Sequence, residues 1–117
     1  MLFLEYPPCS TCKKAKAWLE SHGLEFAARH IKEQNPTQEE LTQWHRQSGL
    51  PLKKFFNTSG MLYRELELKD KLPSMTEEAQ IVLLATDGML VKRPLLVCEN
   101  GKVLTGFREK EWAEALL

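Results

Sequence analysis

Two cysteines near the start of the chain, separated by two residues, are the side chains best suited to chemistry. They stand in the run Cys9-Ser10-Thr11-Cys12, which follows an apolar stretch and precedes a helical pattern. A thiol at the first turn of a helix faces unpaired backbone N–H groups and the positive end of the helix dipole. Both favour the thiolate, the nucleophilic form of cysteine. The spacing and setting therefore predict thiol–disulfide redox chemistry.

Position along the chain assigns different roles to the two thiols. Cys9 lies ahead of the predicted helix, so we expect it to be the more exposed thiolate nucleophile, with Cys12 as the resolving partner of a redox-active disulfide. Lys13, Lys14 and Lys16 follow directly. Their charges either form a solvated helix face or keep the loop electropositive and lower a thiol pKa.

The same C-x-x-C spacing also occurs in zinc sites. A structural zinc ion needs four ligands, normally including a second close pair. The remaining ligand types are a third cysteine and three histidines, none at paired spacing: Cys98, His22, His30 and His45. We therefore favour redox chemistry and expect no metal. The third cysteine ends the apolar run 95–98 and is expected to be a buried core residue.

The elements that must position the thiols follow the order βαβ, then helices, then ββα. Apolar patterns predict strands over 2–6, 26–31, 95–99 and 102–105, the last two joined by the hairpin signal Asn100-Gly101. Helices are predicted over 11–22, 37–48 and 109–117, where Thr37 and Glu40 form a capping-box signature. Shorter helical pieces are predicted over 51–56, 63–68 and 74–87.

This order predicts an α/β fold with a four-stranded mixed sheet of the thioredoxin-like (glutaredoxin-like) type. The chain of 117 residues is long enough for one domain, which we expect to span 1–117. Its thioredoxin-like parts are expected over about 1–34 and 89–117, with a helical insertion over about 35–88.

Charge and composition exclude several classes of function. Sixteen basic and sixteen acidic residues balance, and a large nucleic-acid footprint usually requires a basic excess, so no direct nucleic-acid binding is expected. No apolar run approaches the roughly 20 residues of a membrane span, so no membrane partner is expected. An odd number of cysteines without an export signal indicates a reducing cytoplasm.

A second feature, Arg93-Pro94, precedes the third predicted strand. In a thioredoxin-like fold the proline at this place is characteristically cis and faces the C-x-x-C motif. Pro94 is therefore a candidate cis-proline, and Arg93 would bring a guanidinium toward the thiolate, to stabilise it or hold an oxyanion. Arg108, after the last strand, either approaches the same place or faces solvent.

Taken together, these motifs resemble the arsenate reductase (ArsC)/Spx family, in a short branch that contains C-x-x-C. The resemblance covers the whole chain. The stretches that carry it are YPPCSTCKKA at 6–15, GLP at 49–51, FFNTSG at 55–60, DGMLVKRPL at 87–95 and GF at 106–107.

One branch of function implied by the resemblance is enzymatic. In glutaredoxin-linked arsenate reductases a cysteine at the position of Cys9 attacks arsenate, and three arginines hold the oxyanion. Arg93 and Arg108 match two of these arginines, while the third falls near Asn57; those enzymes also generally lack a cysteine such as Cys12. We therefore expect a thiol–disulfide oxidoreductase acting on an oxidised thiol or small oxyanion. Glutathione with glutaredoxin, or thioredoxin, would supply electrons, and no cofactor would be bound.

The other branch implied by the resemblance is regulatory. Spx-type members are redox-controlled transcription regulators in which the C-x-x-C motif is a disulfide switch. A surface of the same domain binds the RNA polymerase α subunit. Cys9, Cys12 and Arg93 also suit that pattern. A redox-sensing regulator that binds RNA polymerase is therefore the alternative.

Overall fold

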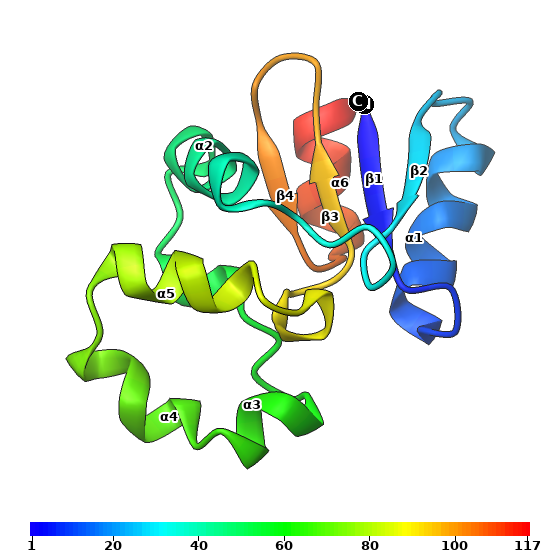
Figure 1. Cartoon of the computed structure of the whole chain (residues 1–117). Coiled ribbons are helices and arrows are strands. Elements are labelled where there is room, and N and C mark those ends of the chain that lie inside the picture. Colours follow the sequence, from blue (N-terminus) through cyan, green and yellow to red (C-terminus); the bar gives the residue numbers. More distant parts are fainter.

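The computed structural model describes all 117 residues and contains one four-stranded mixed sheet, in the order β2-β1-β3-β4 (Figure 1). The central strand β1 (Leu2–Glu5) pairs in parallel with β2 (Ala27–His30) and antiparallel with β3 (Leu95–Val97). The hairpin strand β4 (Val103–Thr105) pairs with β3 and forms one edge of the sheet. The predicted α/β fold with a mixed, thioredoxin-like sheet is confirmed.

Side chains alternate across the strands and divide the core in two. Phe3 is fully buried in a cluster with residues of α1 (Ser10–Ser21) and α6 (Glu109–Leu116), among them Trp112. Leu4, the next residue of β1, is fully buried in the other cluster, which the helices between β2 and β3 complete. The sheet is thus covered on both faces.

Helix α1 begins at Ser10, one residue earlier than expected, and Cys9 is its N-cap. The helix ends at Ser21, and Gly23 follows with the positive φ of 67° that suits a residue without a Cβ. At 12 residues α1 is the longest helix. None of the helices combines the length and the apolar character that crossing a membrane requires.

The segment between β2 and β3 contains seven short helical elements. Their order is α2 (Gln38–Ser48), η1 (Leu52–Phe55), α3 (Met61–Glu65), α4 (Leu68–Lys71), η2 (Leu72–Ser74), α5 (Glu77–Leu84) and η3 (Gly88–Leu90). Figure 1 shows α3, α4 and α5 grouped at a distance from the sheet, whereas α2 lies next to β4.

The prediction of one helical piece over 63–68 is wrong, because the chain turns sharply within it. Glu67 adopts a left-handed conformation with φ 53°, which separates α3 from α4. The turn lets Tyr63 on α3 and Leu68 on α4 both reach the core, where they are 7% and 2% exposed. A continuous helix would carry one of them away from the core. Packing therefore overrides the helical pattern here.

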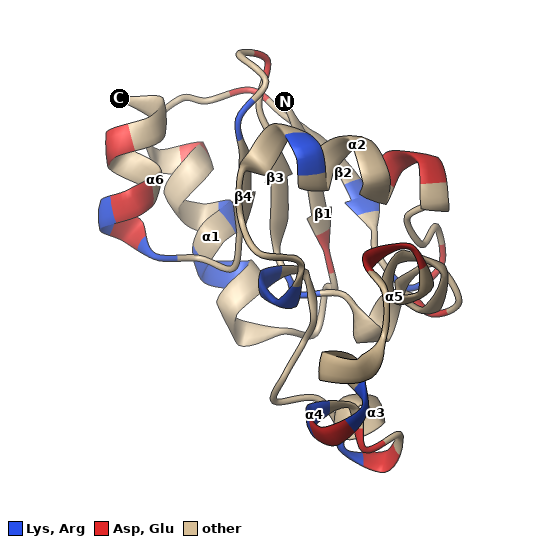
Figure 2. Cartoon of the chain, turned by 90° about the vertical axis from the view of Figure 1, so that its left-hand side faces the viewer, with Lys and Arg blue, Asp and Glu red and all other residues tan.

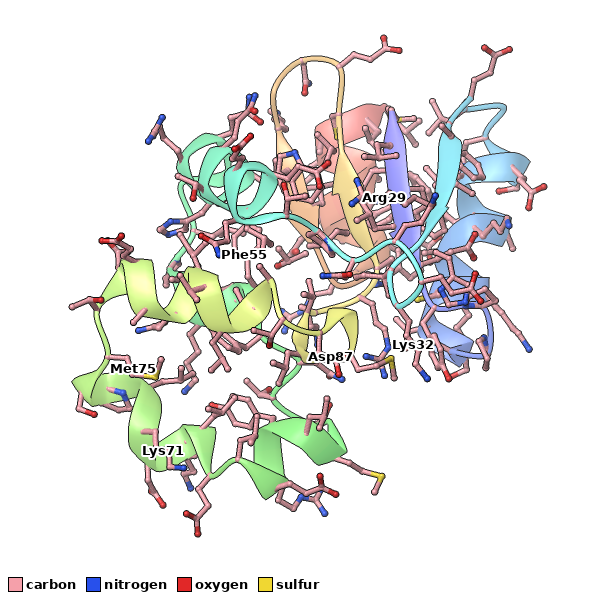
Figure 3. All side chains as sticks on the ribbon, in the orientation of Figure 1. Arg29, Lys32, Phe55, Lys71, Met75 and Asp87 are labelled. Carbon is pink, nitrogen blue, oxygen red and sulfur yellow. The ribbon has the colours of Figure 1, made fainter.

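A capping box and an ion pair join α2 to the sheet. The Thr37 hydroxyl accepts from the Glu40 N–H at 3.1 Å, and Glu40 Oε1 accepts from the Thr37 N–H at 3.0 Å. The same carboxylate accepts two hydrogen bonds from Arg29 of β2, at 2.7 and 2.9 Å. Figure 3 shows Arg29 beside the sheet strands. The Arg29 guanidinium holds the pKa of Glu40 below its usual range, against the opposing effect of burial.

We expect Glu40→Gln to lower the free energy of unfolding at pH 7 by about 1–2 kcal/mol, because it removes the charge but retains a capping oxygen. Since folding lowers the pKa of Glu40, its contribution is full above the unfolded value of about 4.3 and is lost at lower pH. Urea unfolding at pH 7 and pH 3 should therefore show a difference that shrinks in acid. Glu39→Gln, on the exposed side of α2, is the control; an equal loss there would contradict the prediction.

Candidate thiol redox site

The turn from β1 into α1 places the two thiols at different depths. The Cys9 N–H donates to the Tyr6 carbonyl at 2.8 Å, and the Cys9 carbonyl accepts from the Lys13 N–H at 3.1 Å. Cys9 therefore stands at the N-cap with its side chain half-buried. Cys12 lies on the inner face of the first turn and is fully buried. All three cysteines of the chain are free thiols.

The surroundings of Cys9 favour its thiolate. Burial acts to raise its pKa, but hydrogen bonds from the Cys12 N–H, the Cys12 thiol and the Thr11 N–H act in the opposite direction, as does the charge of Arg93. Together these groups outweigh burial and hold the pKa of Cys9 below its ordinary value. Cys9 is thus the thiol of the pair that ionises first.

Cys12 has the opposite character. Burial raises its pKa to about 12, and the hydrogen bond and charge of Cys9 act in the same direction, against the effects of Tyr6 and Arg93. A thiol in this state is a donor rather than a nucleophile while Cys9 is reduced. The pair therefore contains one sulfur whose pKa is lowered and one whose pKa is raised.

We expect iodoacetamide to modify Cys9 alone in the folded protein. Because folding lowers the pKa of Cys9 and raises that of Cys12, the Cys9 thiolate forms first as the pH rises, and its modification rate should reach half-maximum below the ordinary value of about 8.5. Mass spectrometry after modification across a pH series measures this. Cys9→Ser should remove the fast reaction. Earlier modification of Cys12, or a Cys9 titration like that of a free thiol, would contradict the assignment.

The three lysines of α1 are a solvated face and an ion pair rather than a main cause of the lowered thiol pKa. Lys16 is bound at 3.0 Å to Glu5, a buried carboxylate of β1 that is 6% exposed. Lys13 and Lys14 are exposed on the outer face of the helix. None of them is among the groups that shift the pKa of Cys9. They are a solvated face and an ion pair.

The charge of Arg93 lowers the pKa of both thiols, and its side chain has one donor without a partner. Its guanidinium carbon lies 5.1 Å from the centre of the Tyr6 ring, and its Nη1 donates to the Met89 carbonyl at 3.4 Å. Its Nε is buried and has no hydrogen-bond partner. Pro94, the candidate cis-proline, has a cis peptide bond to Arg93. Arg93 therefore enters the site from the segment that leads into β3.

A groove of about 1160 Å³ brings the predicted site residues together. Cys9, Arg93, Arg108 and Asn57 all line it, and we call it the Cys9 groove; Cys12 lies beneath its surface. Arg108 is the N-cap of α6, and its side chain is 77% exposed and 3.8 Å from Glu111. Arg108 thus lies at the rim of the groove and also faces solvent, so both placements predicted for its side chain apply.

Comparison with known proteins identifies the family of the chain. The model of the ArsC family matches residues 4–115. The chain belongs to the ArsC family. The family assignment made from the motifs is confirmed.

Both branches of the ArsC family are among its relatives. A solved structure of an ArsC-family-related protein from Bacteroides fragilis is 60% identical, with a TM-score of 0.93, over 97% of this chain and 94% of that one. The arsenate reductase from Vibrio cholerae is 29% identical, with a TM-score of 0.84, over 99% and 96%. The regulatory protein MgsR from Bacillus subtilis is 32% identical over 95% of this chain and 86% of its own.

Four lysines that sequence reasoning did not assign to the site of this ArsC-family chain also line the Cys9 groove: Lys53, Lys54, Lys92 and Lys102. They come from η1, from the residue before Arg93 and from the β3–β4 hairpin. One signal was available for the first two, because the apolar Leu52 and Phe55 around them must face the core and so turn them outward. No signal in the sequence around Lys92 or Lys102 indicates that they line the groove.

The remaining cysteine and the histidines lie apart from the Cys9 groove. Cys98 is 6% exposed in the core under α1 and α6, as expected, and burial raises the pKa of its thiol. His22 packs against the Trp18 ring, with ring centres 4.3 Å apart, while His30 and His45 pack against Tyr6 and Phe55. No three His, Cys, Asp or Glu side chains cluster as metal ligands.

Proposed function

We propose that this ArsC-family chain is a thiol–disulfide oxidoreductase in which Cys9 attacks and Cys12 resolves. The observation that carries the proposal is the asymmetry of the pair: a half-buried Cys9 with a lowered pKa stands at a groove, over a fully buried Cys12 with a raised pKa. A reaction that uses two thiols in turn requires one thiol to attack the substrate and the other to resolve the mixed disulfide. The reducing cytoplasm is the compartment in which the dithiol form would be maintained.

The reaction balances over two exchanges. The Cys9 thiolate attacks one sulfur of a substrate disulfide, forming a mixed disulfide and releasing the other sulfur as a thiolate. The Cys12 thiol then passes its proton to the released thiolate, and its sulfur attacks the Cys9 sulfur of the mixed disulfide, which releases the second substrate sulfur as a thiolate. Two electrons pass from the cysteine pair to the substrate, leaving a Cys9–Cys12 disulfide. Glutathione with glutaredoxin, or thioredoxin, would return two electrons and reset the pair.

Arg93 supports this chemistry electrostatically. Its charge lowers the pKa of Cys9, and its buried, unpartnered Nε is a donor for a thiolate or an anionic substrate oxygen. Arg108 has a weaker role, because its exposed side chain is screened by solvent. Asn57 is 8% exposed in the Cys9 groove and carries no charge. Because Asn57 stands where the resemblance to arsenate reductases places a third arginine, disulfides are better substrates for the proposed site than arsenate.

The decisive experiment is a coupled turnover assay. Consumption of NADPH would be followed with thioredoxin and its reductase, or with glutathione, glutaredoxin and glutathione reductase, using a small disulfide and arsenate in turn. We expect turnover of the disulfide with at least one donor, abolished in Cys9→Ser and retained in Cys98→Ser. Absence of turnover with both donors, while Cys9 is alkylated normally, would refute the proposed activity.

A redox-sensing regulator is the second candidate, favoured by the 32% identity to the regulatory protein MgsR. In that role the Cys9–Cys12 disulfide would change the affinity for a protein partner, of which the RNA polymerase α subunit is the one implied by Spx-type relatives. Binding of purified polymerase to the reduced and oxidised chain separates the two candidates. Redox-dependent binding without turnover would favour the regulator.

A further inference from the structure

The Cys9 groove is strongly positive although the chain is neutral. Six basic side chains line it, against a single carboxylate, that of Glu111, which faces the guanidinium of Arg108. The whole chain has sixteen basic and sixteen acidic residues, so ten basic and fifteen acidic residues lie outside the groove. Figure 2 shows blue segments at both ends of β4, while red segments gather on α2, α5 and α6. Such a groove attracts acidic ligands.

One wall of the Cys9 groove is an unpaired sheet edge. The Gly106 N–H donates to the Pro94 carbonyl at 2.8 Å, so alternate residues of β4 bond to β3 from that point. The N–H and C=O groups of Val103 and Thr105 point the other way and have no partner in the chain. Val103 as a whole residue is only 4% exposed, so its edge groups are covered, whereas Thr105 is half-buried and lines the groove. The free backbone groups of Thr105 therefore border the groove.

The size of the groove also points to a large ligand. At about 1160 Å³ it exceeds the roughly 300–1,000 Å³ of ordinary small-molecule sites. A single oxyanion or a small thiol would leave most of it empty. An extended polypeptide can occupy its length and pair with a free strand edge at the same time.

We propose that the Cys9 groove binds an extended, acidic polypeptide segment as an added strand along β4, and that a disulfide carried by this segment is the bond that Cys9 attacks. The backbone groups of Thr105 would pair with the segment, and the groove lysines would select its charge. The docking step stands on the groove alone, while the identity of the attacked bond rests on the proposed function.

The binding test uses a fluorescein-labelled seven-residue peptide that alternates Glu and Thr and contains no cysteine. We expect saturable binding by fluorescence polarisation, weakening as NaCl rises. In hydrogen exchange, the amide of Thr105 should exchange several-fold more slowly with peptide bound, whereas that of Leu104 is already bonded to β3 and should not change. No binding, or binding with unchanged exchange at Thr105, would overturn the proposal.

Backbone methylation tests whether the peptide is a strand. Two peptides would carry N-methyl groups on alternate residues, one on the odd-numbered and one on the even-numbered positions. The peptide whose methyl groups replace the N–H groups facing β4 should not bind, and the other should bind almost as well as the unmethylated peptide. Side-chain binding alone would not show this alternation. Equal effects of the two methylation patterns would overturn strand addition.

Charge reversal tests the lysines with a matched control. The double variant Lys53→Glu, Lys54→Glu should raise the peptide Kd about tenfold or more. Lys69→Glu, Lys71→Glu makes the same change of charge on α4, away from the Cys9 groove (Figure 3 labels Lys71), and should change Kd less than twofold. Equal effects of the two pairs would mean that net charge, not the groove, selects the peptide.

A final arm separates this inference from the proposed function. The same peptide carrying a cysteine as a mixed disulfide with a small thiol should react with Cys9 faster than the free small disulfide. If Cys9 reacts with both at equal rates, the oxidoreductase stands and the docking proposal fails. If the cysteine-free peptide binds with the expected exchange pattern but neither disulfide reacts, docking stands and the oxidoreductase fails.

Discussion

Replacing Cys12 by serine is expected to stop the chain midway through its redox cycle, with Cys9 held in a stable mixed disulfide. The serine hydroxyl is close in size to the thiol and still donates to Cys9, so the lowered pKa of Cys9 is largely retained. It cannot attack a sulfur bond. Turnover should fall about 100-fold or more, because an external thiol must replace a positioned one. Intact-mass measurement of the trapped adduct and the coupled assay measure both effects.

Two variants sharpen this result. Cys12→Ala removes the donor as well as the nucleophile, so the pKa of Cys9 should rise toward its ordinary value, which Cys12→Ser should not cause. Cys98→Ser changes a buried thiol outside the Cys9 groove and should leave turnover unchanged. Full turnover in Cys12→Ser would show that Cys9 works with external thiols alone, as in a single-cysteine mechanism.

Most of the fold could be predicted because its signals are local. The capping box at Thr37 and the Asn100-Gly101 turn mark their elements within a few residues, and the structure contains both features where they were predicted. The strand boundaries have weaker local signals. The strand expected over 95–99 ends at Val97, and Cys98 opens the hairpin instead. The break at Glu67 has no local signal, since it arises from the packing of α3 and α4 against a common core.

The candidate site could be predicted in part, for the same reason. The spacing of Cys9 and Cys12 and their position at the start of a helix indicate a thiol redox site. The difference between their pKa values depends on burial in the folded protein and on the charge of Arg93, which is distant in sequence. The lysines of the Cys9 groove come from separate elements, and only the tertiary structure brings them together. Charge patterning along the chain therefore gave no indication of a basic groove in a neutral protein.

Gly88→Ala is expected to be the most damaging small substitution in the chain, at about 3 kcal/mol of unfolding free energy or more. Gly88 begins η3 and is buried against the loop after β2. A Cβ at this position would stand 2.7 Å from the carbonyl carbon of Ile31 and closer still to its oxygen. Both are backbone atoms of a fully buried residue whose N–H donates to Glu5, so neither can move aside freely. Figure 3 shows the neighbouring Asp87 beside this loop, near Lys32.

Gly49→Ala is the matched control, because Gly49 has a φ of 66° but nothing within 4 Å of its would-be Cβ. It should cost only the roughly 1–2 kcal/mol of a left-handed conformation. Urea unfolding compares the two variants. In folded Gly88→Ala, a displaced η3 would also move Arg93 and raise the pH at which Cys9 is alkylated, a shift that Gly49→Ala should not cause. A loss below about 1 kcal/mol in Gly88→Ala would mean that the loop after β2 yields. The close contact at Gly88 would then not determine the position of the segment that leads to Arg93.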